Sequence, residues 1–153
     1  PVPVNYTFNL CNADVLLKLN VVNGKISMPG GLQYDMLTLP DDFTIELITL
    51  KKISTLVKEG ALVYGPKPLR VLSLQNFEKN NEELTALASQ MWGAIDGHSV
   101  FENSFGKGKV LWENHCPCWF HLMLSNPIFL PIRMIRFSSF TSKNSLPVKM
   151  YSL

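Results

Sequence analysis

The sequence predicts an α/β domain organised around a strand–helix–strand unit near its middle. Two short apolar runs, at residues 34–39 and 61–64, have the length of buried strands, and a proline follows each run closely. Between them, apolar residues recur at the spacing that gives a helix one buried face: Leu47, Leu50, Ile53 and Val57. Two apolar strands joined by one helix form a βαβ unit with parallel strands and a right-handed crossover. We therefore expect a partial Rossmann- or flavodoxin-like three-layer sheet with this unit at its centre.

Local signals place the ends of the central helix. Thr44 has the side chain of an N-cap residue, and Gly60 stands where a helix commonly ends in a left-handed glycine. Lysines and a glutamate occupy most of the face opposite the apolar stripe, at Lys51, Lys52, Lys58 and Glu59. The helix should therefore cover the sheet with one face and meet solvent with the other.

The flanking segments carry further turn and cap signals. Asn12 can cap a short helix over residues 13–19, and Asn23-Gly24 is typical of a two-residue hairpin turn within residues 21–26. A second long helix is predicted from a capping-box-like pair to a terminal glycine, with apolar residues at helical spacing: Asn80 and Glu83, Gly93, and Leu84, Leu87, Ala88 and Met91. Residues 99–105 and 109–112 read as a C-terminal β-hairpin.

Charge divides the chain into two regions. Residues 1–114 hold all 12 acidic residues and 10 of the 14 basic ones, whereas residues 115–153 hold four basic residues and no acidic one. No amphipathic period persists after residue 114. We therefore predict an α/β domain over 1–114 and an irregular tail over 115–153, disordered or loosely packed, as a segment translated out of frame would be.

Composition excludes several classes of protein. The net charge of +2 comes from scattered residues and not from a basic stripe, so we expect no nucleic-acid partner. Residues 116–135 are apolar, but three prolines and Arg133 argue against a membrane span. Three cysteines are too few for a disulfide scaffold, and the compartment stays open.

One sheet edge is the candidate site. Asp41 and Asp42 follow the first strand of the βαβ unit, and Lys67 and Arg70 follow the second. Parallel strands bring such loops to the same edge, where α/β proteins bind ligands. The edge is either a polar pocket, a contact surface for a neighbouring domain, or a solvated loop with a capping aspartate.

Other groupings give no catalytic, cofactor-binding or metal-binding residue. Gly106-Lys107-Gly108-Lys109 lacks the context of a phosphate loop, because a strand follows it. The cysteines and histidines at 115–121 have the wrong spacing for a zinc knuckle. The acidic residues of the two helices, Glu46, Glu59, Glu82 and Glu83, are not framed as a glycosidase pair.

A collinear set of short motifs carries a family resemblance across about residues 6 to 113. The motifs include Cys11-Asn12-Ala13-Asp14, Asn23-Gly24-Lys25-Ile26, Ala61 to Pro68, Trp92-Gly93 and Gly106 to Val110. In these the chain resembles the α-L-rhamnosidases of glycoside hydrolase family 106. The resemblance is to their non-catalytic α/β accessory domain, which is similar to a glutamine amidotransferase fold. One departure leaves Leu72 as an apolar residue expected at the surface, and after Trp112 the resemblance stops.

The resemblance implies a parent enzyme that removes terminal α-L-rhamnose from plant glycans. Its two catalytic glutamates and its calcium belong to a barrel with no counterpart here, so this chain is expected to be inactive alone and to have no cofactor. Its partner would be that barrel and, through it, rhamnose-containing glycans, in a secreted or periplasmic enzyme. The usual first strand of such a sheet would precede Pro1, which would leave ladder edges exposed. The alternative is a free-standing small-ligand or protein-interaction module on a Rossmann-like sheet.

Overall fold

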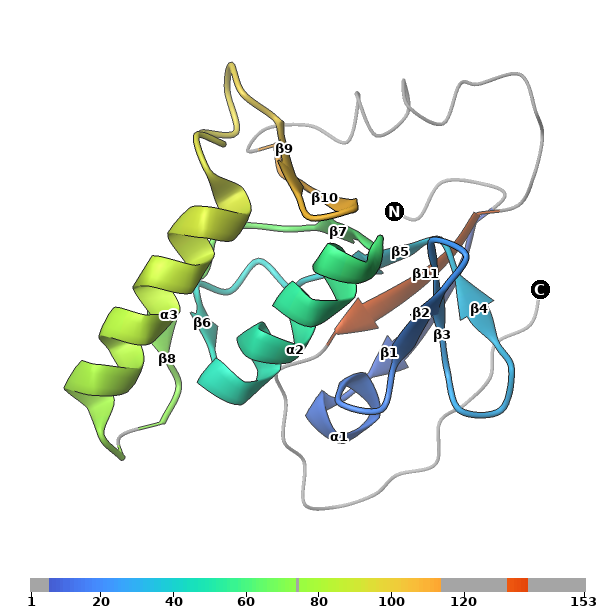
Figure 1. Ribbon diagram of the computed structural model, residues 1–153, viewed down its shortest axis with the longest axis horizontal. Coiled ribbons are helices and arrows are strands. Elements are labelled where there is room, and N and C mark those ends of the chain that lie inside the picture. Colours follow the sequence, from blue (N-terminus) through green and yellow to red (C-terminus); the bar gives the residue numbers. More distant parts are fainter. Residues whose placement is uncertain (1–5, 74, 114–131, 138–153) are drawn as a thin grey trace.

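A computed structural model of the chain describes residues 6–73, 75–113 and 132–137, and these form one mixed six-stranded sheet with its helices (Figure 1). The strands lie in the order β1 (Tyr6–Cys11), β11 (Ile132–Phe137), β5 (Met36–Thr38), β7 (Leu62–Tyr64), β10 (Gly108–Leu111) and β9 (Glu102–Phe105). Within this six-stranded sheet, only the β9–β10 pair is antiparallel. The predicted α/β class with a C-terminal hairpin is confirmed.

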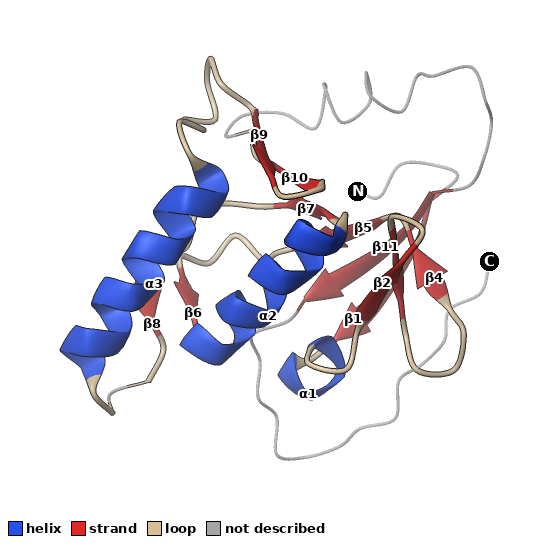
Figure 2. Cartoon of the chain, in the orientation of Figure 1, coloured by secondary structure: helices blue, strands red, loops and turns tan. Residues whose placement is uncertain are grey.

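Smaller elements surround this sheet (Figure 2). A three-stranded antiparallel sheet contains β2 (Asn20–Val22), β3 (Lys25–Ser27) and β4 (Gln33–Tyr34), and a two-stranded parallel ribbon pairs β6 (Thr44–Ile45) with β8 (Arg70–Val71). The helices are α1 (Ala13–Leu16), α2 (Leu47–Glu59) and α3 (Phe77–Trp92). Among the described residues, no helix is long and apolar enough to cross a membrane.

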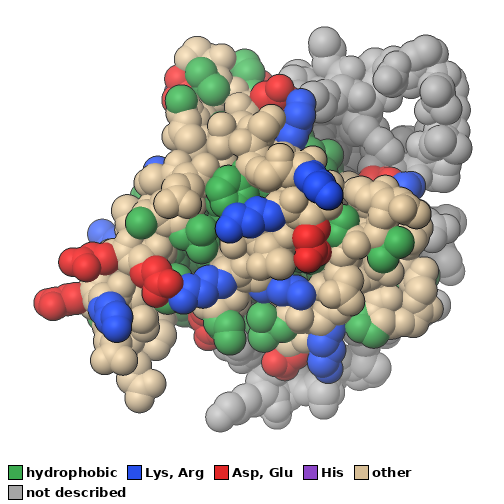
Figure 3. Space-filling model, viewed as in Figure 1, with side chains coloured by type: hydrophobic (Ala, Val, Ile, Leu, Met, Phe, Trp, Pro, Cys, Tyr) green, Lys and Arg blue, Asp and Glu red, His purple; other side chains and the backbone are tan. Residues whose placement is uncertain are grey.

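The predicted βαβ unit is present as β5–α2–β7. β5 and β7 are direct parallel neighbours, with Leu37 opposite Val63. The apolar face of α2 is buried as its spacing predicts, and lysines lie on its outer face, where Figure 3 shows both basic and acidic side chains. Gly60 ends the helix at a φ of 123°.

Two helix starts differ from their predictions. Thr44 is not the N-cap of α2, because it pairs with Arg70 in the β6–β8 ribbon, and the helix begins only at Leu47. The second long helix begins a turn earlier than predicted, at Phe77. Asn80 lies inside it and donates a side-chain hydrogen bond to the carbonyl of Gln75 over 3.0 Å. At Thr44, long-range strand pairing outweighs the local cap signal.

Other local predictions are confirmed. The side chain of Asn12 accepts a hydrogen bond from the amide of Val15 over 3.0 Å and caps the short helix α1, which ends at Leu16 and not at residue 19 as predicted. The β2–β3 hairpin turns through Asn23 and Gly24, both at positive φ, as a type I′ turn requires. The β9–β10 hairpin turns through Gly106 at a φ of 68°.

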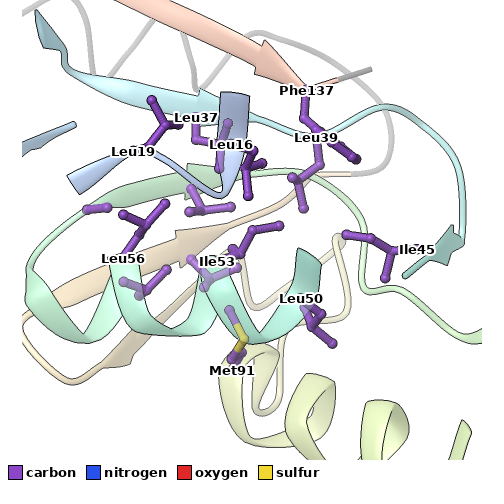
Figure 4. Close-up of a cluster of buried hydrophobic side chains, with 14 of the residues drawn as sticks. Leu16, Leu19, Leu37, Leu39, Ile45, Leu50, Ile53, Leu56, Met91 and Phe137 are labelled. Carbon is purple, nitrogen blue, oxygen red and sulfur yellow. The ribbon is translucent and has the colours of Figure 1, made fainter. Parts of the chain in front are cut away.

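The main core lies between one face of the sheet and the helices (Figure 4). One row of paired strand residues points into it and is fully buried: Ile135, Leu37, Val63 and Val110. The next row faces the other way and is partly open, since Leu10 and Arg136 are exposed and Tyr64 is half-buried. The described residues therefore account for two layers, the sheet and its helices, of the three that were predicted.

Part of the predicted tail differs from expectation. Ile132–Phe137 form β11, which lies inside the sheet and is parallel to both β1 and β5. Ile135 and Phe137 are buried in the core, and Arg136 between them is exposed. Charge composition does not detect this strand because a buried strand needs only alternating apolar residues. The rest of the predicted tail lies outside the described residues.

Candidate functional site

The loops that follow β5 and β7 run side by side at the carboxyl edge of the sheet. The amide of Leu39 donates to the carbonyl of Tyr64 over 2.8 Å, just beyond the paired part of the two strands. Further along, the amide of Leu69 donates to the carbonyl of Phe43 over 2.8 Å, and the two loops then pair as β6 and β8. The structure thus brings the two segments that hold the predicted site residues to one edge.

Two of the four predicted site residues are engaged by the chain itself. Asp42 accepts hydrogen bonds from the amide and the hydroxyl of Thr44, over 3.0 and 2.8 Å, and so forms a local turn. Lys67 donates to the hydroxyl of Ser89 on α3 over 3.0 Å. Asp41 and Arg70 are exposed at the same edge. Two of these side chains therefore stabilise the loops, and the other two are available to a partner.

A glycine and a tryptophan fix the position of the second loop. The indole N–H of Trp92, at the end of α3, donates to the carbonyl of Gly65 over 3.0 Å in the buried core. The amide of Gly65 donates to the carbonyl of Leu111 at the end of β10 over 2.9 Å. The loop that carries Lys67 and Arg70 therefore starts from a rigid point at which α3, β7 and β10 meet.

The edge also holds a tyrosine and a glutamate that the sequence analysis did not select. The pKa of Tyr64 is raised, first by its burial and then by the negative charges of Glu113 and Asp41. One carboxylate oxygen of Glu113 is buried and has no hydrogen-bond partner within the described part of the chain. Tyr64 ends β7 and Glu113 lies two residues after β10, and this position at strand ends is the signal that could have found them.

Three exposed apolar residues directly flank the strands of the β6–β8 ribbon. Phe43, Leu69 and Leu72 are 48%, 53% and 49% exposed, and we call this set the edge patch. Backbone hydrogen bonds hold Phe43 against Leu69 and join Leu72 to Ile45. The expected exposure of Leu72 is confirmed. Asp41, Asp42 and Arg70 lie beside these residues in sequence, so exposed apolar and charged residues occur together at this edge.

The described residues contain no cluster of three or more histidine, cysteine, aspartate or glutamate side chains that could hold a metal ion. The cysteines and histidines at residues 115–121 lie outside the described part, so the prediction for them stays a prediction. Of the acidic residues of the helices, Glu83 pairs with Lys51 over 2.6 Å and joins α3 to α2.

Comparison with known proteins identifies the family. A family profile described as alpha-L-rhamnosidase, glycoside hydrolase family 106, matches residues 1–125. The chain belongs to this family. The match extends past residue 114, where charge composition places the domain boundary, and it ends before β11.

Two longer proteins are similar to this chain. A protein named "Putative beta-glucuronidase" from Formosa agariphila is 41% identical over 90 residues, which are 59% of this chain and 8% of that protein. The structure of a rhamnosidase from Novosphingobium sp. PP1Y is similar in fold, with a TM-score of 0.67 and 24% identity, over 80% of this chain and 11% of that one. This family 106 chain thus spans about a tenth of the length of these two proteins.

Proposed function

We propose that this chain is a non-catalytic accessory domain that docks onto the catalytic part of a larger family 106 glycoside hydrolase. The edge patch carries the proposal. Soluble proteins rarely leave several large apolar side chains exposed together unless the surface meets a partner. Exposed apolar residues with charged neighbours also occur in protein interfaces, in which a polar rim surrounds an apolar core.

The occupant we propose for the edge patch is the remainder of such an enzyme. This chain corresponds to 8% and 11% of the two longer relatives, so most of each relative is available to cover the patch. Full burial of one phenylalanine or leucine side chain contributes roughly 1.5–3 kcal/mol. Three half-exposed side chains can therefore supply several kilocalories per mole of contact energy. The charges of Asp41 and Arg70 can fix the orientation of the partner.

Catalysis, in this proposal, belongs to the larger enzyme. That enzyme would hydrolyse terminal α-L-rhamnosides with two glutamates and would bind calcium outside this chain. The edge itself is a poor candidate for a small-ligand pocket, because Asp42 and Lys67 are already hydrogen-bonded to Thr44 and Ser89. We therefore prefer a docking surface over the free-standing ligand module.

A binding experiment tests this proposal. The Formosa agariphila relative is produced without the segment that matches this chain, and its binding to the immobilised chain is measured by biosensor. We expect saturable binding that Phe43→Asp or Leu69→Asp weakens at least tenfold. Val22→Asp is the matched control, since Val22 is 45% exposed on the β2–β3 hairpin and is not part of the edge patch. Equal weakening by all three variants, or no binding, contradicts the docking role.

A turnover assay tests the other half of the proposal. The purified chain should not release nitrophenol from 4-nitrophenyl α-L-rhamnopyranoside. Turnover that disappears in a Lys67→Ala/Arg70→Ala double variant would place a catalytic site at this edge and overturn the accessory role.

A further inference from the structure

The sheet contains a strand that comes from outside the family-matched part of the chain. The family profile ends at residue 125, and β11 starts at Ile132. Every other strand of the six lies within the matched residues. Yet β11 is not at the margin of the sheet: it separates β1 from β5 and pairs with both (Figure 1).

The matched residues alone would leave two open strand edges that face each other. β1 is joined to the rest of the six-stranded sheet only through β11, because its one strand partner in the described residues is β11. The edge of β5 on that side also pairs only with β11. Unpaired backbone N–H and C=O groups at a sheet edge are costly when buried and attract another strand.

Three residues of the segment that fills this gap, 135–137, alternate between the two faces of the sheet. Ile135 and Phe137 enter the core on the helix side and are 0% and 4% exposed. Figure 4 shows Phe137 among the same buried side chains as Leu39. Arg136 points to the opposite, open face, in the row of Leu10 and Thr38. A β-branched and an aromatic residue at alternate positions suit a strand buried on one face.

We infer that the gap between β1 and β5 is a strand-acceptor site, formed by the family-matched residues and filled by the segment Ile132–Phe137 of the same copy. Its ligand is a single parallel strand that places two apolar side chains, Ile135 and Phe137 here, in the core. Specificity comes from the buried row, and the backbone ladder supplies sequence-independent binding, as in other cases of strand addition.

Engineered disulfides test the occupancy of the site without disturbing the core. Leu10 and Arg136 are exposed register partners on neighbouring parallel strands, which lie about 4.8 Å apart, within the range a disulfide can bridge. In a Cys116→Ser/Cys118→Ser background, the pair Leu10→Cys/Arg136→Cys should form an intramolecular disulfide on mild oxidation. The product is identified by non-reducing gel and peptide mass spectrometry.

The control pair is Leu10→Cys/Thr38→Cys in the same background. With β11 in place, these positions are two strand spacings apart, roughly 9.6 Å, which no disulfide spans. A disulfide in the control pair would mean that β1 pairs directly with β5, and it would overturn the inference. A Leu10→Cys/Arg136→Cys disulfide found only in dimers would assign the strand to a second copy and contradict the same-copy source.

A peptide experiment tests whether the site accepts a strand supplied from outside. Ile135→Asp places a charge in the core row and should expel the chain's own strand, whereas Arg136→Asp changes an exposed position and is the matched control. A fluorescent peptide of residues 130–139 should bind the Ile135→Asp variant at least tenfold more tightly than the wild type or Arg136→Asp. Equal binding to all three, or none to a folded Ile135→Asp variant, would overturn the acceptor site; the disulfide result stands even if that variant does not fold.

Discussion

Gly65 is a position at which a single added methyl group is expected to have a large effect on stability. Its φ is +152°, and a Cβ added there would lie 2.6 Å from the Cβ of Leu39 and 3.3 Å from its Cα. Gly65→Ala therefore combines backbone strain of about 1–3 kcal/mol with overpacking of about 1–3 kcal/mol. Truncating Leu39 to alanine would not relieve the closest contact, because the Cβ remains.

Gly30→Ala separates the two contributions. Gly30 has a φ of +115°, but no atom lies within 4 Å of its added Cβ, so only the backbone strain applies. Urea unfolding followed by tryptophan fluorescence gives the free energy of unfolding of both variants. We expect Gly65→Ala to lower it by about 2–6 kcal/mol, and Gly30→Ala by 1–3 kcal/mol less than that. Sucrose can be added if the variant is partly unfolded in buffer. Equal losses in the two variants would refute the close packing of Gly65 on Leu39.

Three further predictions follow from buried or charged groups. Trp92→Phe leaves the carbonyl of Gly65 without its donor in the core, and urea titration should show a loss of about 2–4 kcal/mol; no loss would contradict this hydrogen bond. The carboxylate of Asp96 accepts hydrogen bonds from three backbone N–H groups and the Ser99 hydroxyl, and these bonds lower its pKa. The stability that they provide is present above about pH 4 and is lost as the pH falls. The melting temperatures of the wild type and Asp96→Asn should therefore converge in acid, and a constant difference between them would contradict this. Burial raises the pKa of Cys11 to about 12, so the free energy of unfolding should fall as the pH rises above about 8.5. A thiol reagent at pH 8 should label Cys11 only in urea, as peptide mapping can show.

Much of the fold follows from local sequence patterns. The helical spacing of Leu50, Ile53 and Val57 predicts the buried face of α2, and Asn23-Gly24 predicts the β2–β3 turn. Both depend on contacts within a few residues, or on a face whose burial any core would provide. The sheet edge that holds Asp41 and Arg70 could also be predicted, because parallel pairing fixes where the two loops end.

The remaining features depend on contacts that span the chain. Thr44 has the side chain of a helix cap but forms a strand, because Arg70 offers it a backbone partner. The tail loses its acidic residues at 114, yet Ile135 and Phe137 fill a place between two distant strands. The edge patch cannot be predicted from the sequence, because the pairing of β6 with β8 decides which residues lie beside Leu69.

Hydrogen exchange of the full chain, measured with and without the segment-deleted Formosa agariphila relative, tests the docking role most directly. The account predicts that the relative slows the exchange of amides in residues 41–45 and 69–72, while amides of the β2–β3 hairpin keep their free rates. Slower exchange confined to that hairpin, or unchanged rates throughout at saturating relative, would contradict the assignment of the β6–β8 edge as the surface that meets the rest of the enzyme.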